Sequence, residues 1–310
     1  MKDPKRYSHS RIATFKTCPR KHHYIYIEGI ETPDTPETIP GRYFHECIER
    51  VNAERDISDL LDGFRNLCTS GKLDMEPDLL EYIVAQYFSY YKNETAKENV
   101  LMCEKEFKDD LYDGDYFVGK ADKVFESDGY ITIRDTKTTR NALKYTHDDV
   151  QFNAQLLIYV PMVEAILGSK VNAIQIDEVR MAKLQPVPIT SKGKPTTDKK
   201  QLGLVTAEDY ENKLNEMGLA GNAEFQTTLD YLRQRGHPLF NRVTAQIVSE
   251  NMVSNNASDF VSAYKAAKLD PDYRVKGPLC RYCQYSELCM LDYESPDQTS
   301  REMIIKKISE

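Results

Sequence analysis

The stretch "ITIRDTKTTR", residues 131–140, begins with the alternation of a half-buried strand and then places an acid close to a base. Ile131 and Ile133 alternate with polar residues, which is the period of two expected of a strand with one buried face. Asp135 and Lys137 follow with one residue between them, so their side chains point to the same face of that strand. The pattern predicts either an ion pair at a strand end or an active site.

The residues around this stretch predict a run of strands followed by a helix. Residues 99–112, 116–126 and 130–137 are rich in alternating apolar positions, and the turn signals "DGD" and "SDG" separate them. A helix interrupted near Pro161 is predicted over 148–168, and a further strand over 170–183.

Helical patterns occupy most of the remaining chain. Helices are predicted over 7–30, 42–54 and 56–98, and again from 206 to about 268, whereas the Pro-rich segments 31–41 and 185–203 read as loops. The order indicates an α/β core wrapped by helical insertions.

Composition and charge exclude some classes of protein. The chain has 310 residues and a net charge of −8, which argues against binding nucleic acid through bulk positive charge. The N-terminus has no apolar core of a signal peptide, and no run approaches the length of a membrane span. We therefore expect a cytoplasmic protein with no membrane partner, whose seven cysteines are reduced or metal-bound.

Asp122 extends the opening stretch to a pair of acids. It lies 13 residues before Asp135, on the preceding predicted strand, and two antiparallel strands joined by a short turn can bring the two side chains together. Two adjacent carboxylates repel each other unless a cation neutralises them, and oxygen ligands suit Mg²⁺ or Mn²⁺. Lys137 could then stabilise charge developing on a phosphate. The structural alternative is that Asp122 caps a turn and that Asp135 and Lys137 form a surface ion pair.

Polar residues on two predicted helices and on one strand could complete such a site. Gly41, His45 and Glu49 share one helix face at spacings of four, and so do Gln151, Gln155 and Tyr159. On the strand before Asp122, either Glu104 or Glu106 could add a carboxylate, and we expect Glu104.

The cysteines predict a second centre. Cys280, Cys283 and Cys289 form C-x2-C-x5-C, and three thiolates at this spacing can surround one metal or cluster but leave a fourth position open. Cys18, near the other end of the chain, is the candidate for that position. A four-cysteine site suits either an iron–sulfur cluster or zinc.

Taken together, "GRYFH", "GKADKV", "IRDTKT" and "QLLIY" resemble the PD-(D/E)xK nuclease superfamily, and within it the RecB-like branch. The resemblance implies a restriction-endonuclease-like core, a central mixed sheet flanked by helices, over about 41–182. It implies that Lys137 is catalytic and faces the phosphate rather than pairing with Asp135, and that Gln155 and Tyr159 contact DNA or that lysine. The implied metal ligands are His45, Asp122, Asp135, the Thr136 carbonyl and, as an added expectation, Glu104.

The arrangement of one cysteine before this core and three after it is similar to that of iron–sulfur nucleases, namely AddB-type subunits, CRISPR-associated RecB-like exonucleases and phage relatives. This resemblance implies a [4Fe–4S] cluster on Cys18, Cys280, Cys283 and Cys289 that staples the two ends of the chain together. It implies one domain over 1–310, with a helical insertion at about 52–98 and a C-terminal helical and cysteine-cluster region at about 204–310.

The function implied is a Mg²⁺- or Mn²⁺-dependent DNA exonuclease that acts on single-stranded DNA or duplex ends in recombination, repair or phage DNA processing. Two alternatives stay open: a catalytically inactive iron–sulfur DNA-binding module, and a subunit of a helicase–nuclease complex. Because the chain has no Walker P-loop, a helicase or recombination partner would have to be a separate protein.

Overall fold

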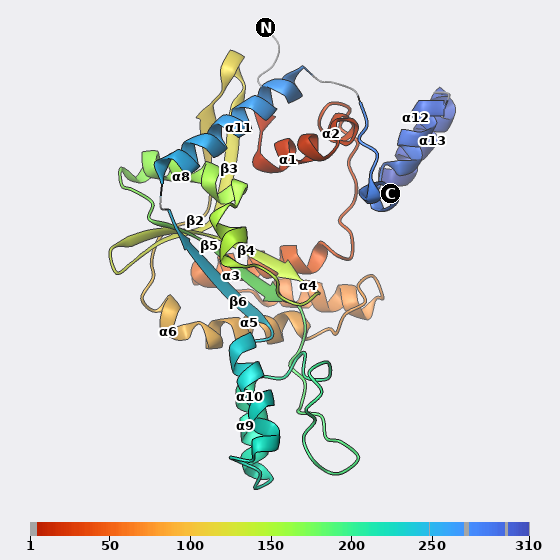
Figure 1. Cartoon of the computed structure of the whole chain (residues 1–310). Coiled ribbons are helices and arrows are strands. Elements are labelled where there is room, and N and C mark those ends of the chain that lie inside the picture. The colour runs from red at the N-terminus through yellow and green to blue at the C-terminus, as the bar shows by residue number, and fades with distance from the viewer. Residues whose placement is uncertain (1–4, 248, 270–272, 295–296, 310) are drawn as a thin grey trace.

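The computed structural model describes residues 5–247, 249–269, 273–294 and 297–309, and the two ends of the predicted single domain, residues 1–4 and Glu310, lie outside them. At its centre is a mixed sheet flanked by helices, as expected for a restriction-endonuclease-like α/β fold (Figure 1). Within the described residues its strands are β1 (Arg6–Tyr7), β2 (Asn99–Asp110), β3 (Tyr116–Ser127), β4 (Tyr130–Thr139), β5 (Ala173–Arg180) and β6 (Phe240–Gln246).

The strand pairing makes β3 and β4 the middle of the sheet. β2, β3 and β4 are antiparallel, β4 and β5 are parallel, and β6 is antiparallel to β5 at the edge. The short strand β1 pairs with the start of β3, on the side that β4 occupies further along. The three strands predicted over 99–137 and the strand predicted over 170–183 are all present.

A two-residue turn fixes the register of β3 against β4. Ser127 and Tyr130 are partners, so only Asp128 and Gly129 lie in the loop. Both have positive φ, 51° and 80°, which is the conformation of a type I′ hairpin turn and one that Asp-Gly adopts at low cost. Because this turn sets the register, it also sets which residues of the two strands face each other further along.

Helices cover both faces of the sheet (Figure 1). One core lies under α1, α8 and α11, and a second lies under α3, α4 and α5. The helix bounds are α1 (His9–Thr17), α2 (Pro19–Tyr26), α3 (Ile39–Asn52), α4 (Ser58–Thr69), α5 (Leu79–Tyr90), α6 (Lys92–Thr95), α7 (His147–Gln151), α8 (Ala154–Leu167), α9 (Ala207–Glu216), α10 (Ala223–Arg235), α11 (Glu250–Lys268), α12 (Ser286–Glu294) and α13 (Gln298–Ser309).

The helix predicted over 148–168 breaks at a different place. The chain leaves helical geometry at Asn153, whose side chain caps α8 by accepting a hydrogen bond from the amide of Leu156. α8 then continues through Pro161, which lies on its exposed side, where the hydrogen bond that proline cannot donate costs least. Gln151 therefore belongs to α7 and is not on the same helix as Gln155 and Tyr159.

Two further expectations need correction. The helical segment predicted over 7–30 is divided at Cys18, which ends α1 and begins α2, with Pro19 in the first position of the second helix. The segment from 206 to 268 contains the strand β6 between its helices, so the sheet extends beyond the predicted core of about 41–182. The region 204–310 is therefore not helical throughout, because β6 is part of the central sheet.

An arm inserted between β5 and β6 projects from the core (Figure 1). Its helices α9 and α10 pack on each other and on the preceding loop through a separate apolar cluster that includes Leu202, Tyr210 and Phe225. Because β5 and β6 are hydrogen-bonded neighbours, the arm leaves and re-enters the core at one place.

The two ends of the chain lie together. Tyr24 of α2 packs on Tyr285, and its hydroxyl donates to Asp292 of α12 at 2.8 Å. Isoleucines of α13 close the same small apolar cluster. The N- and C-terminal segments therefore share a packed interface of their own.

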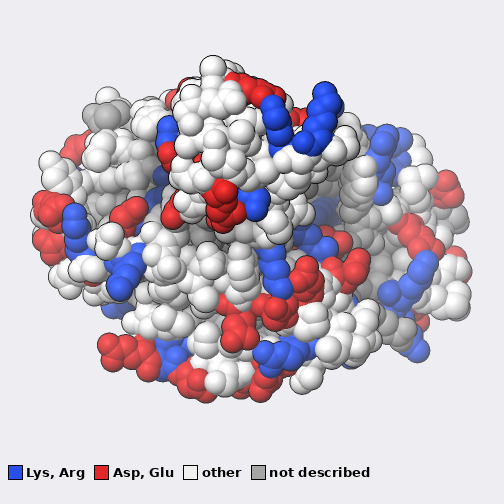
Figure 2. Space-filling view, turned by 90° about the horizontal axis from the view of Figure 1, so that it is seen from below, with Lys and Arg blue, Asp and Glu red and all other residues white. Residues whose placement is uncertain are grey.

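The described surface carries both signs of charge. Seen from below, Lys and Arg side chains are interspersed with Asp and Glu, and neither forms one continuous field (Figure 2). No helix within the described ranges has the length and apolar character needed to cross a membrane.

Candidate active site

The candidate site lies where β3 and β4 separate. Their pairing, which starts at the hairpin turn, reaches Lys123 and Arg134 and then stops. The next residue on each strand is one of the two predicted acids. Oδ2 of Asp122 accepts a hydrogen bond from the amide of Thr136 at 2.7 Å, so the carboxylate takes the place of a strand partner. The expected juxtaposition of Asp122 with the Asp135 segment is present.

Asp135 and Lys137 form an ion pair on the α8 side of this opening. Nζ of Lys137 lies 2.7 Å from Oδ2 of Asp135, so the expectation that these residues do not pair is wrong for this structure. Gln155 of α8 holds both, because its amide oxygen accepts from Lys137 at 3.2 Å and its amide nitrogen donates to Asp135 at 3.1 Å. The same nitrogen lies 3.3 Å from the Tyr159 hydroxyl, so Gln155 contacts the Asp135–Lys137 pair and Tyr159 contacts Gln155.

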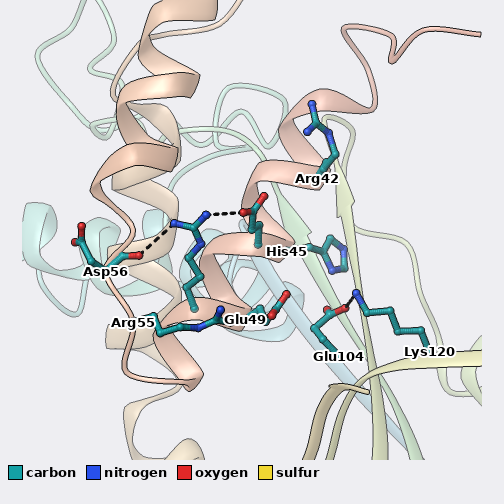
Figure 3. A pocket seen from close by; sticks show the side chains of 9 residues that line it. Arg42, His45, Glu49, Arg55, Asp56, Glu104 and Lys120 are labelled. Atoms are coloured by element: carbon teal, nitrogen blue, oxygen red, sulfur yellow. Dashed lines mark hydrogen bonds and ion pairs between the residues drawn. The ribbon is translucent and has the colours of Figure 1, made fainter. Parts of the chain in front are cut away.

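His45 and Glu104 approach Asp122 from the other side. Nδ1 of His45, on α3, lies 3.4 Å from Oδ2 of Asp122. One ligand atom from each of His45, Glu104 and Asp122 lies within 4.8 Å of the others, and this is the one such group of three found among the described residues. Figure 3 shows His45 and Glu104 pointing into a cavity of about 570 Å³, where Lys120 forms an ion pair with Glu104.

The backbone favours Glu104 over Glu106. Glu104 stands opposite Asp122 in the register of β2 and β3, and its φ of 49° is one that a glutamate in a strand rarely adopts. Such local strain costs about 1–3 kcal/mol and gathers at functional positions. Glu106 instead pairs with the exposed side chain of Arg6.

Burial and mutual repulsion shape the charges. Burial, and secondly the Asp135 carboxylate, raise the pKa of Asp122 well above its ordinary value. Burial likewise raises the pKa of Glu104 and lowers that of His45. Burial alone would lower the pKa of Lys137, but the charge and hydrogen bond of Asp135, together with the charge of Asp122, outweigh burial and the pKa is raised. The lysine is therefore an ammonium ion, whereas the two acids opposite His45 hold their negative charges at a cost.

This donor set fits a hard divalent cation. A histidine nitrogen and carboxylate oxygens are ligands that Mn²⁺ accepts, and the carboxylates also suit Mg²⁺. The raised pKa values of Asp122 and Glu104 mean that their charged forms are disfavoured, and a cation between the two carboxylates would stabilise those charged forms. His45 also lies against the backbone of Thr136, the residue whose carbonyl we expect to assist.

The sequence pattern missed several residues near this site. His9, at the start of α1, lies close enough to Lys137 and Asp135 for both charges to act on its pKa, which burial lowers. Glu178 stands opposite Lys137 on β5 and accepts hydrogen bonds from the amides of Lys144 and Tyr145. The cap sequence "YSHS" is a weak signal for His9, whereas nothing local in the sequence marks Glu178.

A buried acid supports the last paired rung before the separation of the strands. Lys123 and Arg134 are directly opposed cations, which would repel each other. Glu98, only 4% exposed, accepts hydrogen bonds from both, at 2.7 Å from Lys123 and 3.2 Å from Arg134. The shared carboxylate of Glu98 therefore offsets the repulsion between the two cations of the rung that positions Asp122 and Asp135.

The four predicted cysteines line one cavity of about 330 Å³ between the chain ends. Cys18 lies at the start of α2, and Cys280, Cys283 and Cys289 come from the segment before and within α12. Burial raises the pKa of Cys283, and the neighbouring Cys18 and Cys280 act in the same direction. No three of these four described sulfurs lie within 4.8 Å of one another. Tetrahedral zinc at about 2.3 Å from each sulfur would need them about 3.8 Å apart.

A mixed sheet whose central strands separate at two carboxylates and a lysine, with a histidine facing them, is the architecture of a metal-dependent phosphodiester hydrolase. Residues 6–290 match the PD-(D/E)XK nuclease superfamily, and the chain belongs to it. No curated protein matches the chain. The protein is thus a metal-dependent nuclease, with DNA as the substrate suggested by its superfamily and Mg²⁺ or Mn²⁺ as the metal.

Proposed function

We propose that this nuclease is a DNA exonuclease that acts on single-stranded DNA or duplex ends, with a [4Fe–4S] cluster joining its termini. The observation that carries the nuclease site is the meeting of His45, Glu104 and Asp122 within 4.8 Å, beside the Asp135–Lys137 pair. Clustered acids repel phosphate, so a module that only binds DNA gains nothing from them. This disfavours the inactive DNA-binding alternative.

The residues of the proposed site divide into metal ligands and a catalytic lysine. The divalent ion would be held by His45, Asp122, Glu104, Asp135 and the Thr136 carbonyl. When bound, the ion supplies Lewis acidity, which polarises a phosphoryl oxygen and acidifies water. Lys137 orients the attacking water and stabilises the charge that develops on the phosphoryl oxygens. The water oxygen bonds to phosphorus and gives up one proton, the bond from phosphorus to the leaving sugar oxygen breaks, and that oxygen takes up one proton, so the step balances.

The α8 side chains keep Lys137 in place between catalytic events. Gln155 contacts both members of the acid–lysine pair, and Tyr159 contacts Gln155. With Asp135 as a metal ligand, the amide oxygen of Gln155 would remain a hydrogen-bond acceptor for the ammonium group of Lys137. This supports the proposal that Gln155 and Tyr159 belong to the catalytic machinery.

The iron–sulfur part of the proposal rests on the cysteine cavity. Its four cysteines come from both ends of the chain, and their sulfurs are more widely spread than a single zinc ion requires. A cubane cluster is larger than a single ion, and it suits this wider spacing. We propose a structural role in which the cluster closes the loop from Cys18 to Cys280.

A nuclease assay tests the activity. The purified protein is incubated with linear single-stranded, linear duplex and covalently closed circular DNA, with Mn²⁺, Mg²⁺ or chelator. We expect linear DNA to shorten from its ends, closed circles to persist and chelator to stop the reaction. If closed circles were cut as fast as linear DNA, the protein would be an endonuclease and the exonuclease proposal would be wrong. Full activity in Asp135→Ala would overturn the site.

Anaerobic purification tests the cluster. We expect a brown protein with broad visible absorption and about four iron and four sulfide per chain, and loss of the colour in Cys283→Ser. Cys68→Ser, which changes a cysteine outside the cavity, should keep the colour. A colourless protein that contains zinc would refute the iron–sulfur proposal and leave the nuclease proposal intact.

A further inference from the structure

The elements α5, β6 and the end of α10 meet at the edge of the sheet (Figure 1). A further cavity lies there. Its volume is about 460 Å³, within the range of small-ligand sites. We call it the edge pocket and define it by the residues that argue for its role: Tyr90, Lys144, Tyr145, Arg235, His237 and Phe240.

Three of these residues form a compact group of aromatic rings, which we call the tier. The ring of His237 is stacked on Phe240, with centroids 4.8 Å apart and 6° between the planes. The ring of Tyr90 is tilted against both, at 4.5 Å from His237 and 5.5 Å from Phe240, and Tyr90 is the ring that faces solvent, at 51% exposed. Burial, and secondly the charge of Arg235, lower the pKa of His237 to about 4. The tier is therefore uncharged at neutral pH, and stacking on a base suits such rings because every base has a π-face.

Glu94 and Arg242 also line this cavity and form an ion pair at 2.9 Å, so the charge of the edge pocket depends on its two other cations. Lys144 and Arg235 have no carboxylate within ion-pair distance among the described residues, although Arg235 donates to the backbone oxygens of Leu202 and Val205. In the cavity beside His45, by contrast, the cations are paired with acids, as Arg55 is with Glu49 at 2.8 Å. In a chain of net charge −8, unbalanced cations beside exposed aromatic rings favour an anionic, base-bearing ligand.

The pocket is close to the catalytic lysine. Lys137 stands opposite Glu178 on β5, and Glu178 stands opposite Asn241 on β6. Two strand spacings, about 10 Å, therefore separate Lys137 from Asn241, whose side chains lie on the same face of the sheet. Phe240 packs on the opposite face, under α5, and both Phe240 and Asn241 line the cavity, so the edge pocket extends around the edge strand β6. Tyr145 lies between them, since its carbonyl accepts from Asn241 at 3.0 Å and the ammonium group of Lys137 acts on its pKa, which burial raises.

We propose that the edge pocket binds an unpaired base of a DNA strand whose phosphodiester bond lies at Lys137. The tier carries the base, and Lys144 and Arg235 attract the adjoining phosphates. A base within a duplex is stacked and paired, and it cannot enter such a pocket without unpairing. The inference rests on the proposed nuclease function and deepens it, because it selects single-stranded DNA as the substrate.

Binding measured in chelator tests the pocket without cleavage. The probe is a single-stranded oligonucleotide that carries 2-aminopurine, whose fluorescence is quenched on stacking, and the competitor is the same sequence as a duplex. We expect Tyr90→Ala to weaken single-strand binding about 5- to 100-fold and to abolish the quenching. Tyr90→Phe should restore both. Tyr112→Ala, which removes another half-exposed tyrosine away from the pocket, should behave as the wild type.

The two proposals fail in different ways. If Tyr90→Ala kept single-strand binding and quenching within twofold of the wild type, the proposal that the edge pocket binds a base would be wrong. Equal losses for single-stranded and duplex DNA would also overturn it, because they would indicate a site that does not read an unpaired base. Hydrolysis of bis(p-nitrophenyl) phosphate needs only the catalytic centre, so it should be unchanged in Tyr90→Ala. A wild-type protein without any hydrolysis in Mn²⁺ would instead refute the nuclease proposal.

Discussion

The ammonium group of Lys137 lies 2.7 Å from Oδ2 of Asp135, and Gln155 bridges the two residues by bonding to both. The three side chains close a ring in which the acid and the base neutralise each other. Catalysis requires this ring to open, because the proposed roles give Asp135 to the metal and Lys137 to the reacting phosphate. The pair is therefore a resting arrangement, and removing the lysine should affect metal binding and catalysis in opposite directions.

Lys137→Met should reduce cleavage by at least about 100-fold, as expected when a group that stabilises the transition state is lost. Its affinity for Mn²⁺ should be unchanged or higher, because Asp135 loses its competing cation. Calorimetric titration with Mn²⁺, beside the cleavage assay, separates the two effects. Lys170→Met, which removes an exposed lysine paired with Glu164, is the matched control. Retained cleavage in Lys137→Met would contradict the catalytic role.

Asp122→Asn should make the metal-free protein more stable by about 1 kcal/mol while it abolishes cleavage. The folded protein holds the proton of Asp122 more tightly than the unfolded chain does, because burial and Asp135 raise its pKa. The charged form therefore destabilises the fold at neutral pH, and this effect disappears in acid. Thermal unfolding in chelator and in Mn²⁺ measures both parts. Asp148→Asn, at an exposed position, should change neither, and a less stable Asp122→Asn would contradict the expectation.

Gly119→Ala should destabilise the protein by about 1–3 kcal/mol. A methyl group at this position would lie 2.1 Å from the ring of Phe107 and 2.9 Å from that of Tyr159, and both rings are buried. Since Gly119 is three residues before Asp122 on β3, cleavage should fall as well. Urea unfolding checks the change against Gly203→Ala, whose new methyl group meets only an ordinary contact at 3.8 Å. Equal stability of the two variants would argue against this close packing of α8 on β3.

His237 should make the protein less stable in mild acid. Its folded pKa is about 4, against an ordinary 6.5, so between these values the unfolded chain binds a proton that the folded protein does not. Stability should therefore fall as pH drops through this window, and His237→Phe should flatten the dependence. Urea unfolding at about pH 7.5 and about pH 5 measures it, with exposed His147→Phe as control. If the pH dependence of stability were unchanged in His237→Phe, groups other than His237 would cause the loss of stability in acid.

The parts of the site that follow from short-range sequence were predictable. The Asp-Gly turn sets the β3–β4 register, and that register alone brings Asp122 beside the Asp135 segment. The i, i+4 spacing of Gln155 and Tyr159 likewise places both on one face of α8. In each case, one element or one tight turn determines the outcome.

The parts that depend on distant partners were not predictable. In a regular strand Glu104 and Glu106 would lie on the same face. The positive φ of Glu104 distinguishes the two residues, and no sequence pattern predicts it. β6 has few apolar residues and lies between helices, so only its pairing with β5 makes it a strand. The D-x-K pattern predicted an ion pair as one of two alternatives, but it could not decide whether Lys137 pairs with Asp135, because that depends on the side-chain conformation of a long lysine.

The α9–α10 arm is inserted between two paired strands, so sequence changes in the arm need not alter the sheet. Because β5 and β6 are hydrogen-bonded along their length, the arm can be lengthened, shortened or exchanged while the strand that carries Glu178 keeps its register. A cut in the loop over 185–203 would likewise leave two fragments still held by the sheet. Apart from Arg235 at its base, which lines the edge pocket, the arm is thus free to diverge faster than the strands of the sheet, and closely related nucleases should differ most there.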